Sequence, residues 1–140
     1  GNFLSQFSSK KIEKSSTVLF NELFFDGFIH QIKLAEEHNS WFTKEAILFS
    51  LDNWTSALTH ENLNQWISNE NVVEKSSKTV AIVMAGNIPL VGFHDFLCVL
   101  LSGNKAICKL SSDDKTLLPA LAEHLIAFVP ELKERIVLFC

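Results

Sequence analysis

The hydrophobic residues of this 140-residue chain change their spacing near residues 74–78. Before this point they recur at steps of three and four, the spacing that puts side chains on one face of an α-helix. The clearest stripe consists of Phe20, Phe24, Phe28, Ile32 and Ala35. It predicts a helix over residues 19–37.

Two more helices are predicted before the change in spacing. Thr43 and Thr59 stand where a side-chain oxygen can accept a hydrogen bond from the first turn of each helix. The first of these helices carries the apolar stripe Ile47, Leu51, Trp54 and Leu58. The second is short and carries Leu63, Trp66 and Ile67. Residues 68–78 are polar and lack periodicity, which predicts a linker.

After the change, three short apolar runs alternate with two helical patterns. Residues 79–85 are rich in β-branched side chains and almost wholly apolar, which predicts a strand buried on both faces of a parallel sheet. Strands are also predicted at 105–109 and 135–140, and helices at 90–102 and 113–128. The first helix should bury Phe93, Leu97, Leu100 and Leu101 and stop at Gly103-Asn104. Ser111 and Ser112 are expected to supply the N-cap of the second helix.

This order of elements predicts the fold class α/β, with N-terminal helices followed by a partial doubly wound parallel sheet. Strand, helix, strand, helix, strand is half of such a fold. We expect residues 1–77 to form an N-terminal helical segment and residues 78–140 to form the first half of a Rossmann-like cofactor-binding domain. The sequence ends on a strand, so the sheet is expected to be truncated.

Composition argues against several classes of function. The chain has 16 acidic and 12 basic residues and no basic run, which disfavours binding to nucleic acid. No apolar stretch approaches the roughly 20 residues of a membrane-spanning helix, so we expect no integral membrane segment. The three cysteines are odd in number and contain no C-x-x-C pair, which indicates reduced thiols and a cytoplasmic location.

The loop at residues 85–89, Ala-Gly-Asn-Ile-Pro, is the most informative stretch for function. It follows a predicted buried strand, at the end of the sheet where open α/β folds place their ligands. Asn87 could donate hydrogen bonds to an oxygen that gains negative charge during acyl transfer. Asn87 could equally close the turn or cap the next helix, because asparagine is common at such positions.

Longer motifs favour a role of Asn87 in chemistry over a role in closing the turn or capping the helix. Residues 84–95 read MAGNIPLVGFHD, Gly103-Asn104 forms a turn before a strand, and residues 109–114 read KLSSDD. These motifs resemble the early cofactor-domain segment of aldehyde dehydrogenases. They are most similar to the acyl-CoA reductase branch of that superfamily, which is related to the fatty acyl reductase subunit of bacterial bioluminescence. The resemblance spans nearly the whole chain but only the first part of a complete reductase, and it implies a truncated aldehyde dehydrogenase-like fold.

The resemblance implies NADPH-dependent reduction of an acyl-CoA thioester to an aldehyde. Asn87 matches the asparagine of the oxyanion hole, and Lys109 matches the lysine that reaches the adenosine ribose of the cofactor. Gly86, Ser111 and Ser112 are expected at the same cofactor site. Ser112 stands where aldehyde dehydrogenases commonly have a ribose-binding glutamate, and the lack of that carboxylate favours NADPH over NADH.

The resemblance also places the catalytic cysteine beyond the last residue of this chain, so the fragment should be inactive alone. Cys98 and Cys108 are therefore expected to be packing residues, with no His and Asp spaced to activate either thiol. The five histidines show no ligand spacing, so no metal site is expected. The pair His94-Asp95 could line a pocket or lie on a helix surface.

Two alternatives to an enzyme stay open. The chain could be a non-catalytic module that binds a nucleotide or CoA through Asn87 and Lys109. It could also be an interaction domain whose aromatic helices contact another chain, for example a second copy in a homo-oligomer. Core packing or an oligomer contact explains the aromatic helices better than a membrane-surface role, because their polar faces are acidic as often as basic.

Overall fold

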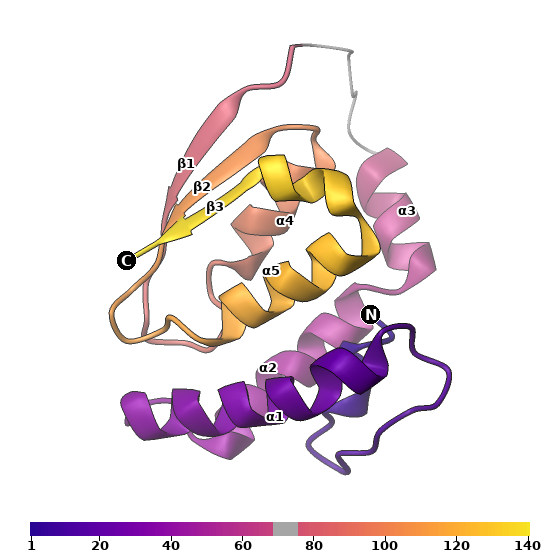
Figure 1. Cartoon of the computed structure of the whole chain (residues 1–140), viewed down its shortest axis with the longest axis vertical. Coiled ribbons are helices and arrows are strands. Elements are labelled where there is room, and N and C mark those ends of the chain that lie inside the picture. The colour runs from indigo at the N-terminus through magenta and orange to yellow at the C-terminus, as the bar shows by residue number, and fades with distance from the viewer. Residues whose placement is uncertain (69–75) are drawn as a thin grey trace.

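The computed structural model describes residues 1–68 and 76–140 of the chain, and it confirms the α/β fold class. Strands β1 (Thr79–Val83), β2 (Lys105–Lys109) and β3 (Ile136–Phe139) form a parallel sheet in the order β1-β2-β3 (Figure 1). The predicted strand at 105–109 is confirmed residue for residue. The predicted linker at 68–78 falls largely on residues 69–75, which lie outside the described residues.

Three helices precede the sheet and two connect its strands. The first three are α1 (Asn21–His38), α2 (Lys44–Ala57) and α3 (His60–Ser68). The connecting helices are α4 (Phe93–Leu101) and α5 (Leu117–Phe128). Short 3-10 helices, η1 (Leu4–Gln6) and η2 (Pro130–Glu134), lie near the start of the chain and before β3.

Both predicted threonine caps are present. The hydroxyl oxygen of Thr43 accepts a hydrogen bond from the backbone of Ala46 at 3.2 Å. Thr59 accepts one from the backbone of Asn62 at the same distance. These contacts satisfy amide groups that have no partner inside the first turn of a helix, which explains why α2 and α3 begin where they do.

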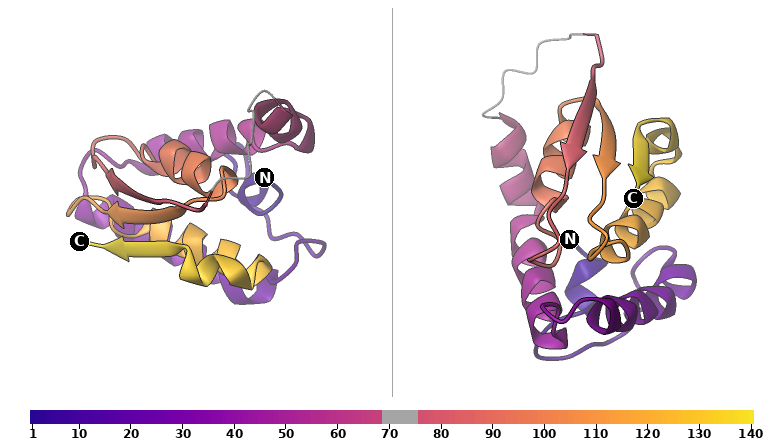
Figure 2. Two further views of the ribbon diagram at one scale, coloured as in Figure 1. Left: turned by 90° about the horizontal axis from the view of Figure 1, so that it is seen from above. Right: turned by 90° about the vertical axis from the view of Figure 1, so that its left-hand side faces the viewer.

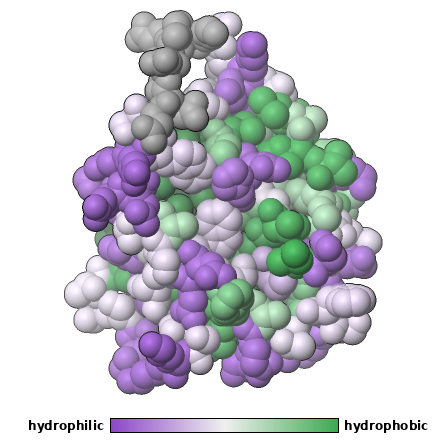
Figure 3. Space-filling view, turned by 180° about the vertical axis from the view of Figure 1, so that it is seen from behind, coloured by the Kyte–Doolittle hydropathy of each residue, from purple (hydrophilic) through white to green (hydrophobic). Residues whose placement is uncertain are grey.

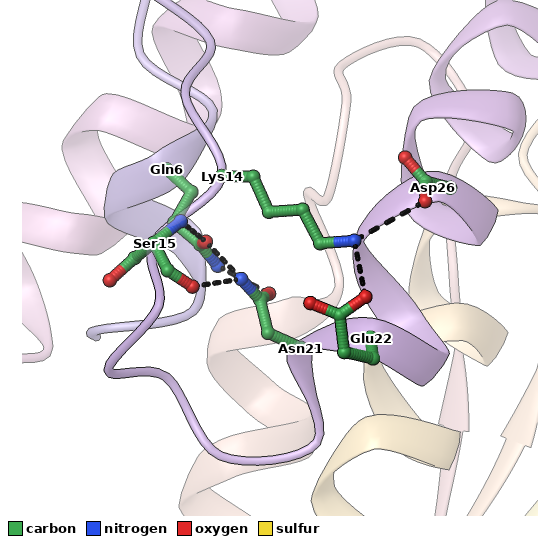
Figure 4. A network of polar contacts seen from close by, with 6 residues as sticks. All are labelled: Gln6, Lys14, Ser15, Asn21, Glu22 and Asp26. Carbon is green, nitrogen blue, oxygen red and sulfur yellow. Dashed lines mark hydrogen bonds and ion pairs between the residues drawn. The ribbon is translucent and has the colours of Figure 1, made fainter.

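The buried face of α1 confirms the predicted stripe at Phe28, Ile32 and Ala35 and differs from it at the start of the helix. The residues facing the core are Asn21, Phe25, Phe28, Ile32 and Ala35, while Phe20 precedes the helix with a left-handed φ of 59°. The face is set by a buried polar network at the helix start (Figure 4). There the Asn21 amide donates to Gln6 at 2.7 Å and to the Ser15 carbonyl at 2.6 Å. Since Asn21 points inward, Phe25 one turn later does so as well.

Helices α4 and α5 lie on the same side of the sheet (Figures 1 and 2). Strand order advances in one direction and parallel crossovers are right-handed, so both helices reach the same face. The other face is exposed, and the prediction that β1 is buried on both faces is wrong. Val83 is 79% exposed and Phe139 is 47% exposed. The view from behind shows apolar surface on the side of the molecule where β1 lies (Figure 3).

The connecting helices start later than their patterns predicted. Helix α4 starts at Phe93 because Leu90 adopts a left-handed φ of 60°. The helix buries Phe96, whereas Leu101, which was predicted to be buried, is 41% exposed. Helix α5 starts at Leu117. Ser111 and Ser112 therefore do not cap it and instead belong to a turn closed by a bridge between Ser111 and Asp114.

Buried residues of the helical segment and of the sheet region form one continuous core. Phe3 packs against Phe7 and Phe28, and its ring stacks on His124 of α5 with a centroid distance of 3.8 Å. Helix α1 runs beside α5 (Figure 1). The division into residues 1–77 and 78–140 stays a prediction.

Candidate active site

Two loops leave the sheet side by side at its carboxyl edge. We call residues 86–90, after β1, the β1 loop, and residues 110–116, after β2, the β2 loop. The backbone N–H of Met84 donates to the Lys109 carbonyl at 3.0 Å, so the backbone after β1 stays paired with β2 for one more residue. This pairing brings the predicted site residues to one edge of the sheet.

The two loops touch at Gly86 and Ser111. A side-chain Cβ at Gly86 would meet the Ser111 hydroxyl oxygen, and it would lie 2.8 Å from Ser111 Cβ and 3.2 Å from Asp113 Cβ. Residue 86 must therefore be glycine for the β2 loop to lie this close. The structure thus brings Gly86 and Ser111 together, as their predicted membership of one site requires.

Asn87 and Lys109 present their side chains to solvent. Within the described ranges 1–68 and 76–140, neither side chain forms a hydrogen bond or an ion pair. Asn87 therefore does not cap α4, whose N-cap residue is Gly92. Among the described residues, no contact of the Asn87 side chain supports a role in closing the turn either. Its carboxamide stays available to a ligand at the sheet edge.

Ser111 and Ser112 shape the β2 loop. The Ser111 hydroxyl oxygen accepts a hydrogen bond from the backbone of Asp113 at 3.2 Å. The Ser112 hydroxyl donates to the Asp113 carboxylate at 3.3 Å and is exposed. A negative charge therefore lies next to Ser112, although the residue itself is neutral.

Asn39 joins both loops to the end of α1, although no sequence pattern predicted this role. Its amide nitrogen donates to the Gly86 carbonyl at 2.7 Å and to the Asp113 carbonyl at 3.1 Å. Its amide oxygen accepts from the backbone of Trp41 at 2.9 Å. In the sequence, the only available signal was a polar residue in a turn after a helix.

Two further residues hold the β1 loop from other elements. Ser50 of α2 donates its hydroxyl proton to the Pro89 carbonyl at 2.8 Å. Asp114 is buried behind the loop, and burial raises the pKa of its carboxyl group to about 6. The backbone amides of Leu90 and Leu117 face this carboxyl group and offset part of the rise in its pKa.

The cysteines differ in their surroundings. Cys108 is fully buried in β2, and burial raises the pKa of its thiol to about 11, which suits the predicted packing role. Cys98 departs from its prediction, because the one-turn spacing puts its sulfur 3.8 Å from both ring nitrogens of His94. A sulfur equidistant from both nitrogens does not lie along the in-plane lone pair of either, so the contact is poorly placed for proton transfer.

His94 lies on the exposed surface of α4. Its Nδ1 is 3.2 Å from the Asp95 carboxylate, and its ring stacks on Trp66 of α3 at a centroid distance of 5.3 Å. Among the described residues, no three His, Cys, Asp or Glu side chains are grouped as metal ligands. In the same residues, no helix has the length and apolar character needed to cross a bilayer.

Comparison with known proteins matches this chain to a protein family. Residues 15–139 match the family model described as acyl-CoA reductase (LuxC). Neither the curated proteins nor the solved structures yielded a match. The matched range covers almost the entire chain, including α1, both loops and all three strands. The chain therefore belongs to the acyl-CoA reductase (LuxC) family.

Proposed function

We propose that a reductase containing this chain reduces an acyl-CoA thioester to an aldehyde, with NADPH as the cofactor and in the cytoplasm. The observation that carries the proposal is the pairing of the two loops at the carboxyl edge of the sheet. There, Gly86 contacts Ser111 while Asn87 and Lys109 leave their side chains unpaired within the described residues. Family membership supplies the reaction class.

Asn87 has the chemistry needed at the reacting carbonyl. We assign its amide group to donate a hydrogen bond to the acyl oxygen, which gains negative charge when a nucleophile adds to the carbon. By the resemblance described above, the nucleophile is a cysteine outside these 140 residues. Its thiolate displaces CoA, which leaves as a thiolate, and the acyl group is then held as an enzyme thioester. NADPH, when bound, would supply a hydride to this acyl carbon, and breakage of the carbon–sulfur bond would release the aldehyde and restore the cysteine thiolate.

Lys109 and the β2 loop fit the nucleotide end of the cofactor. Lys109 is an exposed cation at the end of β2, which suits hydrogen bonding to ribose hydroxyls. Ser112 offers a neutral hydroxyl where a carboxylate would repel a 2′-phosphate. The Asp113 carboxylate beside it opposes this preference, so we expect selectivity for NADPH over NADH of moderate size.

The test measures loss of NADPH absorbance with a series of acyl-CoAs. Asn87→Ala should lower kcat by about two orders of magnitude, the usual effect of losing one oxyanion donor. Asn87→Asp keeps the size of the side chain but removes the donor, and should be at least as slow. Asn62→Ala, at an exposed asparagine of α3, is the matched control and should keep wild-type kcat.

Two variants test the cofactor assignment. Lys109→Ala should raise the KM for NADPH, whereas Lys133→Ala, at an exposed lysine in η2, should not. Ser112→Glu should shift preference toward NADH. NADPH binding without acyl-dependent oxidation would favour the module that binds a nucleotide or CoA. Absence of both, in a folded protein, would favour the interaction domain.

A further inference from the structure

We propose that Asn39 is a positioning residue that holds the β1 loop and the β2 loop in one fixed arrangement, with Ser50 as a second support of the β1 loop. The inference rests on the proposed role of Asn87. It concerns two side chains that lie in the helical segment and do not face the sheet edge themselves.

The Asn39 amide uses all of its hydrogen-bonding protons on the two loops. It is 5% exposed, and its nitrogen donates to the carbonyls of Gly86 and Asp113. Its oxygen is held by the Trp41 amide, which fixes the orientation of the carboxamide. Three segments that are distant in the sequence therefore meet at one buried side chain.

The end of α1 does not explain why residue 39 is asparagine. The cap contact is made by its backbone, whose N–H donates to the Ala35 carbonyl at 3.1 Å. Its φ is −135°, an extended value that any residue adopts, so no left-handed conformation selects asparagine here. The side-chain oxygen closes a local turn by accepting from the Trp41 amide, which an aspartate could also do, but only an amide nitrogen can donate to both loops as well.

Asn39 anchors the peptide plane that enters Asn87, and Ser50 anchors a peptide plane farther along the β1 loop. The Gly86 carbonyl belongs to the peptide bond that enters Asn87, and a planar peptide fixes the direction of both its ends. The Pro89 carbonyl, held by Ser50 at 2.8 Å, belongs to the peptide bond that enters Leu90. Asn87 thus lies between two anchored units, and a shift of about 1 Å at such a site can cost about a hundredfold in rate.

Amide hydrogen exchange of the purified protein tests this arrangement directly. The N–H of Val91, bonded to the Ile88 carbonyl, reports on the β1 loop, and the N–H of Asp114, bonded to the Ser111 carbonyl, reports on the β2 loop. Asn39→Ala should speed exchange at both amides by about tenfold. Ser50→Ala should speed Val91 alone, by about threefold.

Matched controls separate loop support from general loss of stability. Asn62→Ala removes the bond from an asparagine of α3 to the Ser56 carbonyl of α2, and Ser56→Ala removes a serine bond to the Asp52 carbonyl in α2. Both should leave the exchange of Val91 and Asp114 unchanged. If Asn39→Ala does not fold, Asn39→Asp decides the question, since it keeps the bond from Trp41 and loses the donor to both loops. Wild-type exchange at Val91 and Asp114 in the Asn39 variant that folds would overturn the positioning role, and wild-type exchange at Val91 in Ser50→Ala would overturn the support given by Ser50.

Kinetics then link the loops to the reaction. Ser50→Ala should lower kcat by several-fold with an unchanged KM for NADPH, because it touches the β1 loop only. Asn39→Ala should lower kcat by about tenfold and raise that KM, because it touches both loops. Faster exchange with unchanged kcat would refute the positioning role while the proposed function stands. A wild-type protein without acyl-dependent turnover would refute the proposed function, and the exchange rates would still judge the loop contacts.

Discussion

Asp114→Asn should change how the stability of the protein depends on pH. The Asp114 carboxyl group is 8% exposed, and burial raises its pKa from 3.8 to about 6. The folded state therefore holds this proton more tightly than the unfolded chain does. The resulting stabilisation is complete below pH 3.8 and is lost as the pH rises through about 6. A rise of roughly two pKa units corresponds to about 3 kcal/mol.

His124 should change the stability of the protein with pH in the opposite direction, over nearly the same pH range. Burial among the rings of Phe3, Phe24 and Phe128 lowers its pKa from 6.5 to about 4, and the nearby amino terminus adds to the lowering. The folded state thus favours the neutral ring. This stabilisation is present above pH 6.5 and is lost as the pH falls toward 4, by up to about 3 kcal/mol. The two groups should largely cancel in the wild type.

Urea unfolding at half-unit steps from pH 4 to pH 7 measures both effects. The free energy of unfolding of Asp114→Asn minus that of wild type should increase by about 3 kcal/mol from pH 4 to pH 7. For His124→Leu, the same difference should decrease by a similar amount, since the loss from Asp114 is then uncompensated. Parallel pH curves for wild type and Asp114→Asn would refute the assignment of a buried carboxyl group that titrates near pH 6.

Three other substitutions should have simple outcomes. Thr43→Ala should lower the free energy of unfolding by about 1 kcal/mol, because the N-cap bond to Ala46 is lost, and urea unfolding measures it. Arg135→Lys should cost on the order of 1–2 kcal/mol in the same assay, since a lysine cannot reproduce the guanidinium contacts to the carbonyls of Leu100 and Asn104. Gly86→Ala should raise the KM for NADPH and lower thermal stability, because its Cβ would push against Ser111; unchanged values would contradict the close approach of the two loops.

Local patterns predicted the elements well where neighbours in sequence decide the outcome. The strand at 105–109 and the caps at Thr43 and Thr59 depend on residues within a few positions of one another. The stop at Gly103 follows from its left-handed φ of 82°. These features were therefore readable from spacing and residue type alone.

Predictions failed where distant residues decide. The start of the buried face of α1 is set by the contact of Asn21 with Gln6, fifteen positions away, which an apolar stripe does not show. The burial of β1 depends on which face the crossover helices occupy. Composition cannot show this, because an apolar strand looks the same with one face covered or two.

The candidate site was predictable in part for the same reason. Parallel strands end at one edge of a sheet, so strand order alone predicted that the β1 loop and Ser111 lie close together. Asn39 was not predictable, since its contacts to Gly86 and Asp113 span 47 and 74 positions of sequence. Whether Asn87, Lys109, Gly86, Ser111 and Ser112 act on acyl group and cofactor stays a prediction.

The strand order β1-β2-β3 restricts which kind of connection can cover the exposed face of the sheet. A right-handed connection from β3 onward in the same direction would return its helix to the face already occupied by α4 and α5. Only a step back to a new strand beside β1 would lay a helix over Val83 and Phe139. The winding direction would then reverse at β1, and such reversals open the crevice in which α/β sheets bind ligands. Topology alone would put that crevice beside Asn87.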